Sequence, residues 1–82
     1  MLNLEVKTKL SQEEVMDRVK RAFGKEGLGL DLKEDTPSCL TFEGGGGYVN
    51  ATVCEEEDGQ TRVDFVTQEW DYQVKELASK LS

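Results

Sequence analysis

Apolar and polar residues alternate along most of this chain, which is the pattern of strands that bury one face. Leu2, Leu4 and Val6 are separated by polar residues at the start. The same alternation recurs between turn residues further along the chain. It predicts strands over residues 2–7, 28–33, 38–43, 48–55 and 61–67.

One stretch between the first two predicted strands has helical spacing instead. Ser11 followed by Glu14 forms a capping box, in which the serine side chain accepts a backbone N–H and begins a helix. The apolar positions that follow are spaced for one helix face, and they are Val15, Val19, Ala22 and Phe23. Gly24 and Gly27 predict the end of this helix.

A second helix is predicted at the end of the chain, beginning near Trp70 or Asp71. Its apolar residues recur at helical spacing, at Val74, Leu77, Ala78 and Leu81. Both predicted helices therefore have one apolar face, which each must bury against the sheet.

Two hairpin turns set the predicted register of the sheet. Gly44–Gly47 is interpreted as a flexible hairpin loop, and Asp58-Gly59 as a tight turn. Pairing Phe42 with Val49 and Ala51 with Phe65 then places the large apolar residues on one face. That covered face also includes Leu28, Leu30 and Leu32 of the second predicted strand. We therefore predict an α+β fold of two layers, in which both helices cover one face of a curved five-stranded antiparallel sheet.

The element order strand, helix, four strands, helix resembles the TATA-binding-protein-like architecture. The helix-grip group of START-type lipid-transfer and polyketide-cyclase proteins shares this order. The resemblance covers the whole chain and is carried by element order, by the capped first helix after strand one, and by a final helix led by Asp71. It implies that the last helix packs over the sheet, and that a ligand, where present, lies between them.

Size and charge narrow the classes of partner. The 82 residues support one domain over residues 1–82, and the net charge of −7 opposes binding to nucleic acid or to an anionic membrane. We expect no signal peptide and no membrane span, because no long apolar run is present. Cys39 and Cys54 are too few for a disulfide scaffold, so a reducing cytoplasmic location is the expectation.

No set of residues in the sequence indicates catalysis, a metal or a cofactor. Histidine is absent, which removes the commonest general base and metal ligand. The four glycines join two strands, whereas a phosphate-binding loop leads from a strand into a helix. The acidic run Glu55–Asp58 lacks the spacing of a calcium loop and is expected to be a solvated hairpin tip. We predict a protein that is not an enzyme.

The open face of the sheet is the leading candidate for function. It combines an aromatic side chain, an arginine and several hydrogen-bonding groups, which are types suited to a contact with an unknown protein partner or with a second copy of the chain. The candidate partner-binding residues are Tyr48, Asn50, Thr52, Arg62 and Asp64. The alternative is a small apolar ligand held between the last helix and the sheet by Trp70, Val74 and Leu77.

Overall fold

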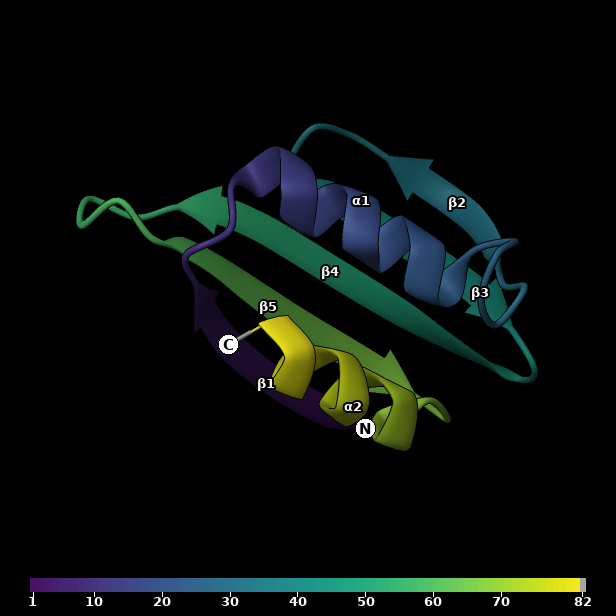
Figure 1. Ribbon diagram of the computed structural model, residues 1–82. Coiled ribbons are helices and arrows are strands. Elements are labelled where there is room, and N and C mark those ends of the chain that lie inside the picture. Colours follow the sequence, from purple (N-terminus) through teal and green to yellow (C-terminus); the bar gives the residue numbers. More distant parts are fainter. Residues whose placement is uncertain (82) are drawn as a thin grey trace.

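The computed structural model describes residues 1–81, and it has the predicted α+β architecture. The elements in chain order are β1 (Leu2–Thr8), α1 (Gln12–Phe23), β2 (Asp31–Asp35), β3 (Cys39–Gly44), β4 (Gly47–Glu55), β5 (Thr61–Gln68) and α2 (Asp71–Leu81). The five strands form one antiparallel sheet in the order β1-β5-β4-β3-β2, so β4 is the central strand. β1 and β2 are the two edges, and the sheet does not close (Figure 1).

The predicted hairpin registers are confirmed. Phe42 lies opposite Val49 in the β3–β4 pair, and Ala51 lies opposite Phe65 in the β4–β5 pair. β1 pairs with β5 in a continuous register from Leu2 opposite Thr67 to Thr8 opposite Thr61. Because side chains alternate along each strand, these pairings separate one apolar face from one polar face.

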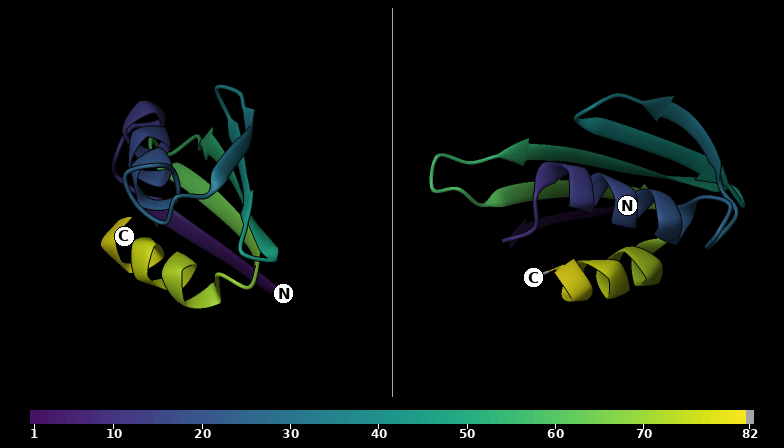
Figure 2. Two further views of the ribbon diagram at one scale, coloured as in Figure 1. Left: turned by 90° about the vertical axis from the view of Figure 1, so that its right-hand side faces the viewer. Right: turned by 45° about the horizontal axis from the view of Figure 1, so that its top comes forward.

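Both helices lie on the same side of the sheet, α1 over β3 and β4 and α2 over β1 and β5 (Figures 1 and 2). Their apolar faces and that of the sheet enclose a core of these buried residues: Val6, Val15, Met16, Val19, Phe23, Leu30, Leu40, Phe42, Val49, Ala51, Val53, Val63, Phe65, Val74, Ala78 and Leu81. Ser11 caps α1 as predicted, since its hydroxyl accepts the Glu14 N–H at 3.1 Å. Neither helix of the described chain is long and apolar enough to cross a membrane.

The second strand differs from its prediction. It runs from Asp31 to Asp35 and begins three residues later than the alternation of leucines suggested. Leu28 lies in the preceding loop, where its N–H donates to the Ala22 carbonyl and helps to end α1. Leu32 faces the helix side opposite Phe42 but is 42% exposed, because α1 packs over β3 and β4 and not over this edge. The prediction was therefore wrong for Leu28, which is not part of the strand, and Leu32 lies on the predicted side without being buried, while Leu30 is buried as predicted.

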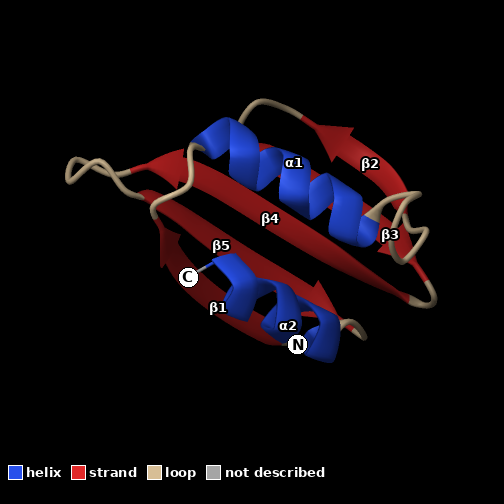
Figure 3. Cartoon of the chain, in the orientation of Figure 1, coloured by secondary structure: helices blue, strands red, loops and turns tan. Residues whose placement is uncertain are grey.

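The glycine segment is tighter than the flexible loop that was predicted. Gly44 and Gly47 pair across the hairpin, so only Gly45 and Gly46 lie between the strands (Figure 3). Both have positive φ angles, 60° and 83°, as a type I′ turn requires. The Trp70 indole N–H donates to the Gly44 carbonyl at 3.1 Å, and a Cβ on Gly45 would lie 2.6 Å from the Trp70 ring. The close approach of the tryptophan thus explains why glycine occupies this turn.

Candidate functional site

The open face is the side of the sheet that neither helix covers (Figure 2). All five predicted partner-binding residues lie on it, because they occupy alternate positions of β4 and β5. Tyr48, Asn50 and Thr52 follow one another along β4, and Arg62 and Asp64 lie on β5. Thr52 is directly opposite Asp64, while Tyr48 is opposite Gln68.

Tyr48 is half-buried at the end of β4 that leaves the glycine turn. Its cross-strand neighbours on the open face are Glu43 of β3 and Gln68 of β5. On the helix side, the buried Thr67 hydroxyl donates to the Tyr48 carbonyl at 2.7 Å. The Thr67 hydroxyl therefore holds the backbone of Tyr48 from the helix side of the sheet, and the tyrosine side chain lies on the open face.

Asn50 belongs to a hydrogen-bonded row that crosses three strands. Its Nδ2 donates to Thr41 Oγ1 at 2.9 Å, and Thr41 Oγ1 in turn donates to Glu34 Oε1 at 3.1 Å. Cys39 adds a weaker contact from its Sγ to the same Glu34 oxygen at 3.4 Å. These contacts tie the edge strand β2 to the centre of the sheet, so Asn50, which is half-buried, has a structural role on the open face.

Arg62 is surrounded by carboxylates. Its Nε lies 3.2 Å from Asp64 and 3.7 Å from Glu5, and its Nη1 lies 3.2 Å from Glu56. The pKa of Arg62 is raised, first by its electrostatic interaction with the sulfur of Cys54 and then by Asp64 and Glu56. Arg62 therefore stays charged and holds three acidic side chains that would otherwise repel one another.

The candidate residues do not form one compact cluster. Arg62 is opposite Cys54, which is six residues from Tyr48 along β4. At roughly 3.3 Å per residue, this places the tyrosine and the arginine about 20 Å apart. The open face thus has a Tyr48 end, next to the glycine turn, and an Arg62 end, next to the acidic turn between β4 and β5.

The open face is predominantly acidic. Lys33, which the alternation placed here, lies at a bulge in β2 and has no cross-strand partner. The carboxylates on this side are Glu5, Asp31, Glu34, Glu43, Glu56 and Asp64, and the paired strands contribute only Lys7 and Arg62 as cations. The contacts of Glu5, Glu34 and Glu56 were missed by sequence reasoning. The alternation of Glu5 with Lys7 places both on one face, but only the pairing of β1 with β5 brings Glu5 to Arg62.

The residues of the alternative ligand site serve the packing between α2 and the sheet. Val74 is fully buried within the core, and Leu77 is a half-buried side chain packed against it. The Trp70 ring lies on the glycine turn and uses its indole N–H there. All three residues therefore have a structural contact that accounts for their position.

The two cysteines are free thiols one diagonal step apart on the open face, since Cys39 is opposite Thr52 and Cys54 follows two residues later. Within residues 1–81, no group of three or more histidine, cysteine or acidic residues is arranged to hold a metal ion. No arrangement of a nucleophile with a base is present among the contacts described above. The chemistry of the open face is that of a polar, charged contact surface.

Comparison with protein-family models and with curated proteins identifies no relative of this chain. No protein-family model matches the chain, and no curated protein matches it either. The function is therefore argued from the surface itself.

Proposed function

We propose that this is a cytoplasmic, non-enzymatic binding protein whose open sheet face docks onto a basic surface of a partner protein. The observation that carries the proposal is the charge of that face, six carboxylates against two cations among the paired strands and Glu56, on the side of the sheet that neither helix covers. Interfaces select partners of complementary potential, which also accelerates their encounter. The same charge opposes face-to-face binding of a second copy and binding of nucleic acid.

The size of the face supports a protein partner of moderate affinity. Five strands about 4.8 Å apart and a central strand of nine residues give an area of roughly 20 by 30 Å. This approaches the ~800 Å² that each protein contributes to a standard interface. Tyr48 and Val66 are half-buried on the face, and they supply apolar contact area among the charges.

The helix-grip resemblance suggests a second function, in which a small apolar ligand lies between α2 and the sheet. We rank it below protein binding because Val74 is fully buried in the core and the Trp70 ring is engaged with the glycine turn. A ligand at Trp70, Val74 and Leu77 would have to displace these contacts. Native mass spectrometry of the purified protein tests this alternative directly, since a retained ligand adds its mass.

The proposal is tested with a photo-crosslinking amino acid at Thr52, an exposed position in the middle of the open face. The matched control carries the same amino acid at Lys75, an exposed position on α2. We expect one basic protein to be crosslinked from position 52 and not from position 75, and Tyr48→Ala to reduce the yield without changing the thermal midpoint. Equal crosslinking from both positions, or a partner that only position 75 captures, would exclude the open face.

Arg62→Gln separates a basic from an acidic partner. It removes one of the two cations on the face and leaves Glu5, Glu56 and Asp64 without their shared counter-ion. A basic partner should then associate faster at low salt, because the face becomes more negative. A slower association would contradict the charge argument and would indicate that Arg62 itself contacts an acidic partner.

A further inference from the structure

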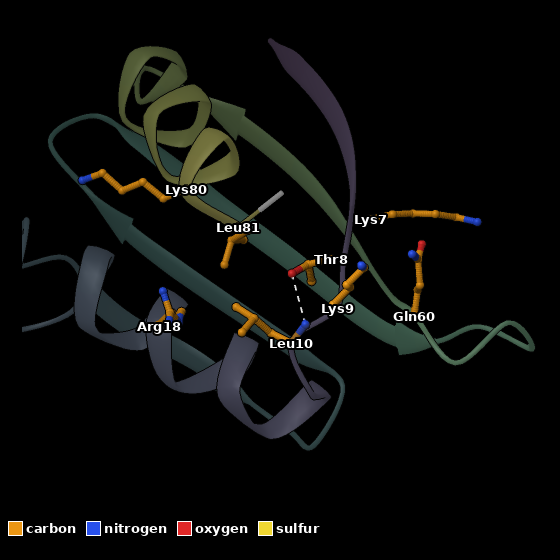
Figure 4. Close-up of a pocket in the computed structure, with 8 residues that line it drawn as sticks. All are labelled: Lys7, Thr8, Lys9, Leu10, Arg18, Gln60, Lys80 and Leu81. Carbon is orange, nitrogen blue, oxygen red and sulfur yellow. Dashed lines mark hydrogen bonds between the residues drawn. The ribbon is translucent and has the colours of Figure 1, made fainter.

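A cleft of about 500 Å³ lies at the other side of the molecule, between the ends of the two helices (Figure 4). Four separate parts of the chain line it, namely the segment from β1 to α1, the second turn of α1, the residue before β5 and the end of α2. The lining residues are Lys7, Thr8, Lys9, Leu10, Arg18, Gln60, Lys80 and Leu81. Its volume is within the range of about 300–1,000 Å³ that small-molecule sites occupy.

The charge of this cleft is opposite to that of the whole protein. The chain has 17 acidic and 10 basic residues, yet among the described residues four basic and no acidic side chains line the cleft. Two other clefts beside α1 are mixed: one includes Asp17, Glu26 and Asp31, and the other includes Glu13, Asp35 and Glu55. The concentration of positive charge is therefore a local property of this position.

Two of the four cations are available to a ligand. Lys7 is paired with Asp58 at 3.5 Å, and Lys80 with Glu76 at 3.6 Å. Lys9 and Arg18 have no ion pair in the part of the chain that the structure describes. In Figure 4 they lie on either side of Leu10 and Leu81, while the amino groups of Lys7 and Lys80 point away from the centre of the cleft.

The floor of the cleft is apolar. Leu81 is buried, and Leu10 is half-buried and packs against the core. Thr8 is also buried, and its hydroxyl oxygen accepts the Leu10 N–H at 3.2 Å, which leaves the hydroxyl proton for a further acceptor. The cleft thus combines an apolar surface with two unpaired cations and one hydroxyl donor.

We propose that this cleft binds a small amphipathic organic anion. Lys9 and Arg18, which flank the cleft, attract its carboxylate, sulfonate or phosphate group, and its apolar part lies on Leu10 and Leu81 between them. The guanidinium of Arg18 suits an oxyanion because it donates two parallel hydrogen bonds. Of the residues that line this site, the open face shares Lys7, which is paired with Asp58, so the proposal does not rest on the protein-binding function proposed above.

The gathering of cations at this cleft has a competing explanation. The carbonyl groups at the C-terminal end of α2 attract positive side chains whether or not a ligand binds. The test is a fluorescence titration with 1-anilinonaphthalene-8-sulfonate, a probe with one sulfonate and an apolar ring system, followed by displacement with sodium octanoate. Lys9→Gln and Arg18→Gln should each weaken the probe Kd by about threefold to tenfold. Both residues are exposed and have no ion pair within residues 1–81, so the thermal midpoint should stay within about 2 °C.

The matched control is Lys25→Gln, which makes the same charge change at an exposed position just beyond the far end of α1. It should leave the probe Kd within about twofold, as exposed charges at that distance are screened. Three results would overturn the proposal. They are no saturable binding of the probe below about 1 mM, an equal loss in the control variant, and displacement by sodium sulfate as effective as by octanoate.

Discussion

The two ends of the open face adjoin hairpin turns of opposite character. At the Tyr48 end, the uncharged Gly45-Gly46 turn lies beneath Trp70 and the connection from β5 to α2. At the Arg62 end, the turn of Glu57, Asp58 and Gly59 is charged and projects beyond the rest of the sheet (Figure 1). A Cβ on Gly59 would meet nothing within 4 Å, whereas one on Gly45 would meet the tryptophan ring.

This difference shows how one sheet can present two kinds of surface. Packing fixes the Tyr48 end, where the Trp70 ring lies on the turn and its indole N–H donates to the Gly44 carbonyl. Charge pairs shape the Arg62 end, where Glu5, Glu56 and Asp64 gather around one guanidinium and Lys7 pairs with Asp58. Exposed ion pairs of this kind weaken with salt. The two ends should therefore respond differently to substitution.

Gly47→Ala should have the largest effect on stability. A Cβ at this position would overlap the backbone carbonyl oxygen of Gln68 and the side chain of Glu69, so the end of β5 must move. We expect a loss of about 3 kcal/mol in the free energy of unfolding, at the upper end for overpacking in a well-packed region. Urea denaturation measures it. A loss below about 1 kcal/mol would mean that the turn yields easily and that the Tyr48 end is not rigid.

Trp70→Ala should be the next largest change. It removes the ring from the glycine turn and the hydrogen bond of 3.1 Å to the Gly44 carbonyl. Since the ring is only half-buried, we expect about 2–3 kcal/mol, below the range for a fully buried aromatic residue. Tyr72→Ala is the control, because Tyr72 is 71% exposed and should lose almost nothing. Similar losses in both variants would contradict the role assigned to Trp70.

The two hairpins were predictable because the alternation of apolar residues and the turn residues indicate the same register. Phe42, Val49, Ala51 and Phe65 reach one face only in the observed register, and Gly59 has the positive φ of 84° that a three-residue turn needs. The second strand was not predictable in this way. The repeat of Leu28, Leu30 and Leu32 imitates a strand, but the first leucine helps to end α1 and the last lies at an edge beyond the helix.

The sequence predicts which residues share the open face, but it does not predict the contacts between them. A period of two places Tyr48, Asn50, Thr52, Arg62 and Asp64 on one side without any knowledge of the fold. The carboxylates around Arg62 come from β1 and from the residue after β4, and only the tertiary pairing brings them together. The basic cleft could not be anticipated, because its lining residues come from four distant segments.

Gly59→Ala should have a smaller effect than either change at the other turn. The position has open space around it, so the cost comes only from placing alanine at a φ of 84°. We expect about 1 kcal/mol, which the reduced freedom of the unfolded chain partly offsets. In the same urea experiment, Gly47→Ala measures the cost of steric overlap, whereas Gly59→Ala measures the cost of backbone strain. If Gly59→Ala were the more destabilising variant, the contrast between the two turns would be wrong.

Asp58→Asn should have the smallest effect, and it should depend on pH. The pKa of Asp58 is lowered, first because its carboxylate accepts the backbone N–H of Gln60, at 3.0 Å, and also because Lys7 lies nearby. A lowered pKa in the folded state contributes stability above the pKa of the unfolded chain, near 3.8, and this stability is lost as the pH falls through the folded pKa.

Asparagine keeps an oxygen that can accept the Gln60 N–H but has no charge for Lys7. The variant should therefore have a slightly lower thermal midpoint than the parent protein at pH 7, and the difference should shrink as the pH falls below 3.8 and through the lowered pKa of the folded state. Glu57→Gln on the same turn is the control, since Glu57 has no ion pair in the described chain, and its midpoint should follow the parent protein throughout. A difference between Asp58→Asn and the parent that stays constant from pH 7 to pH 2 would show that the charge of Asp58 does not stabilise the turn.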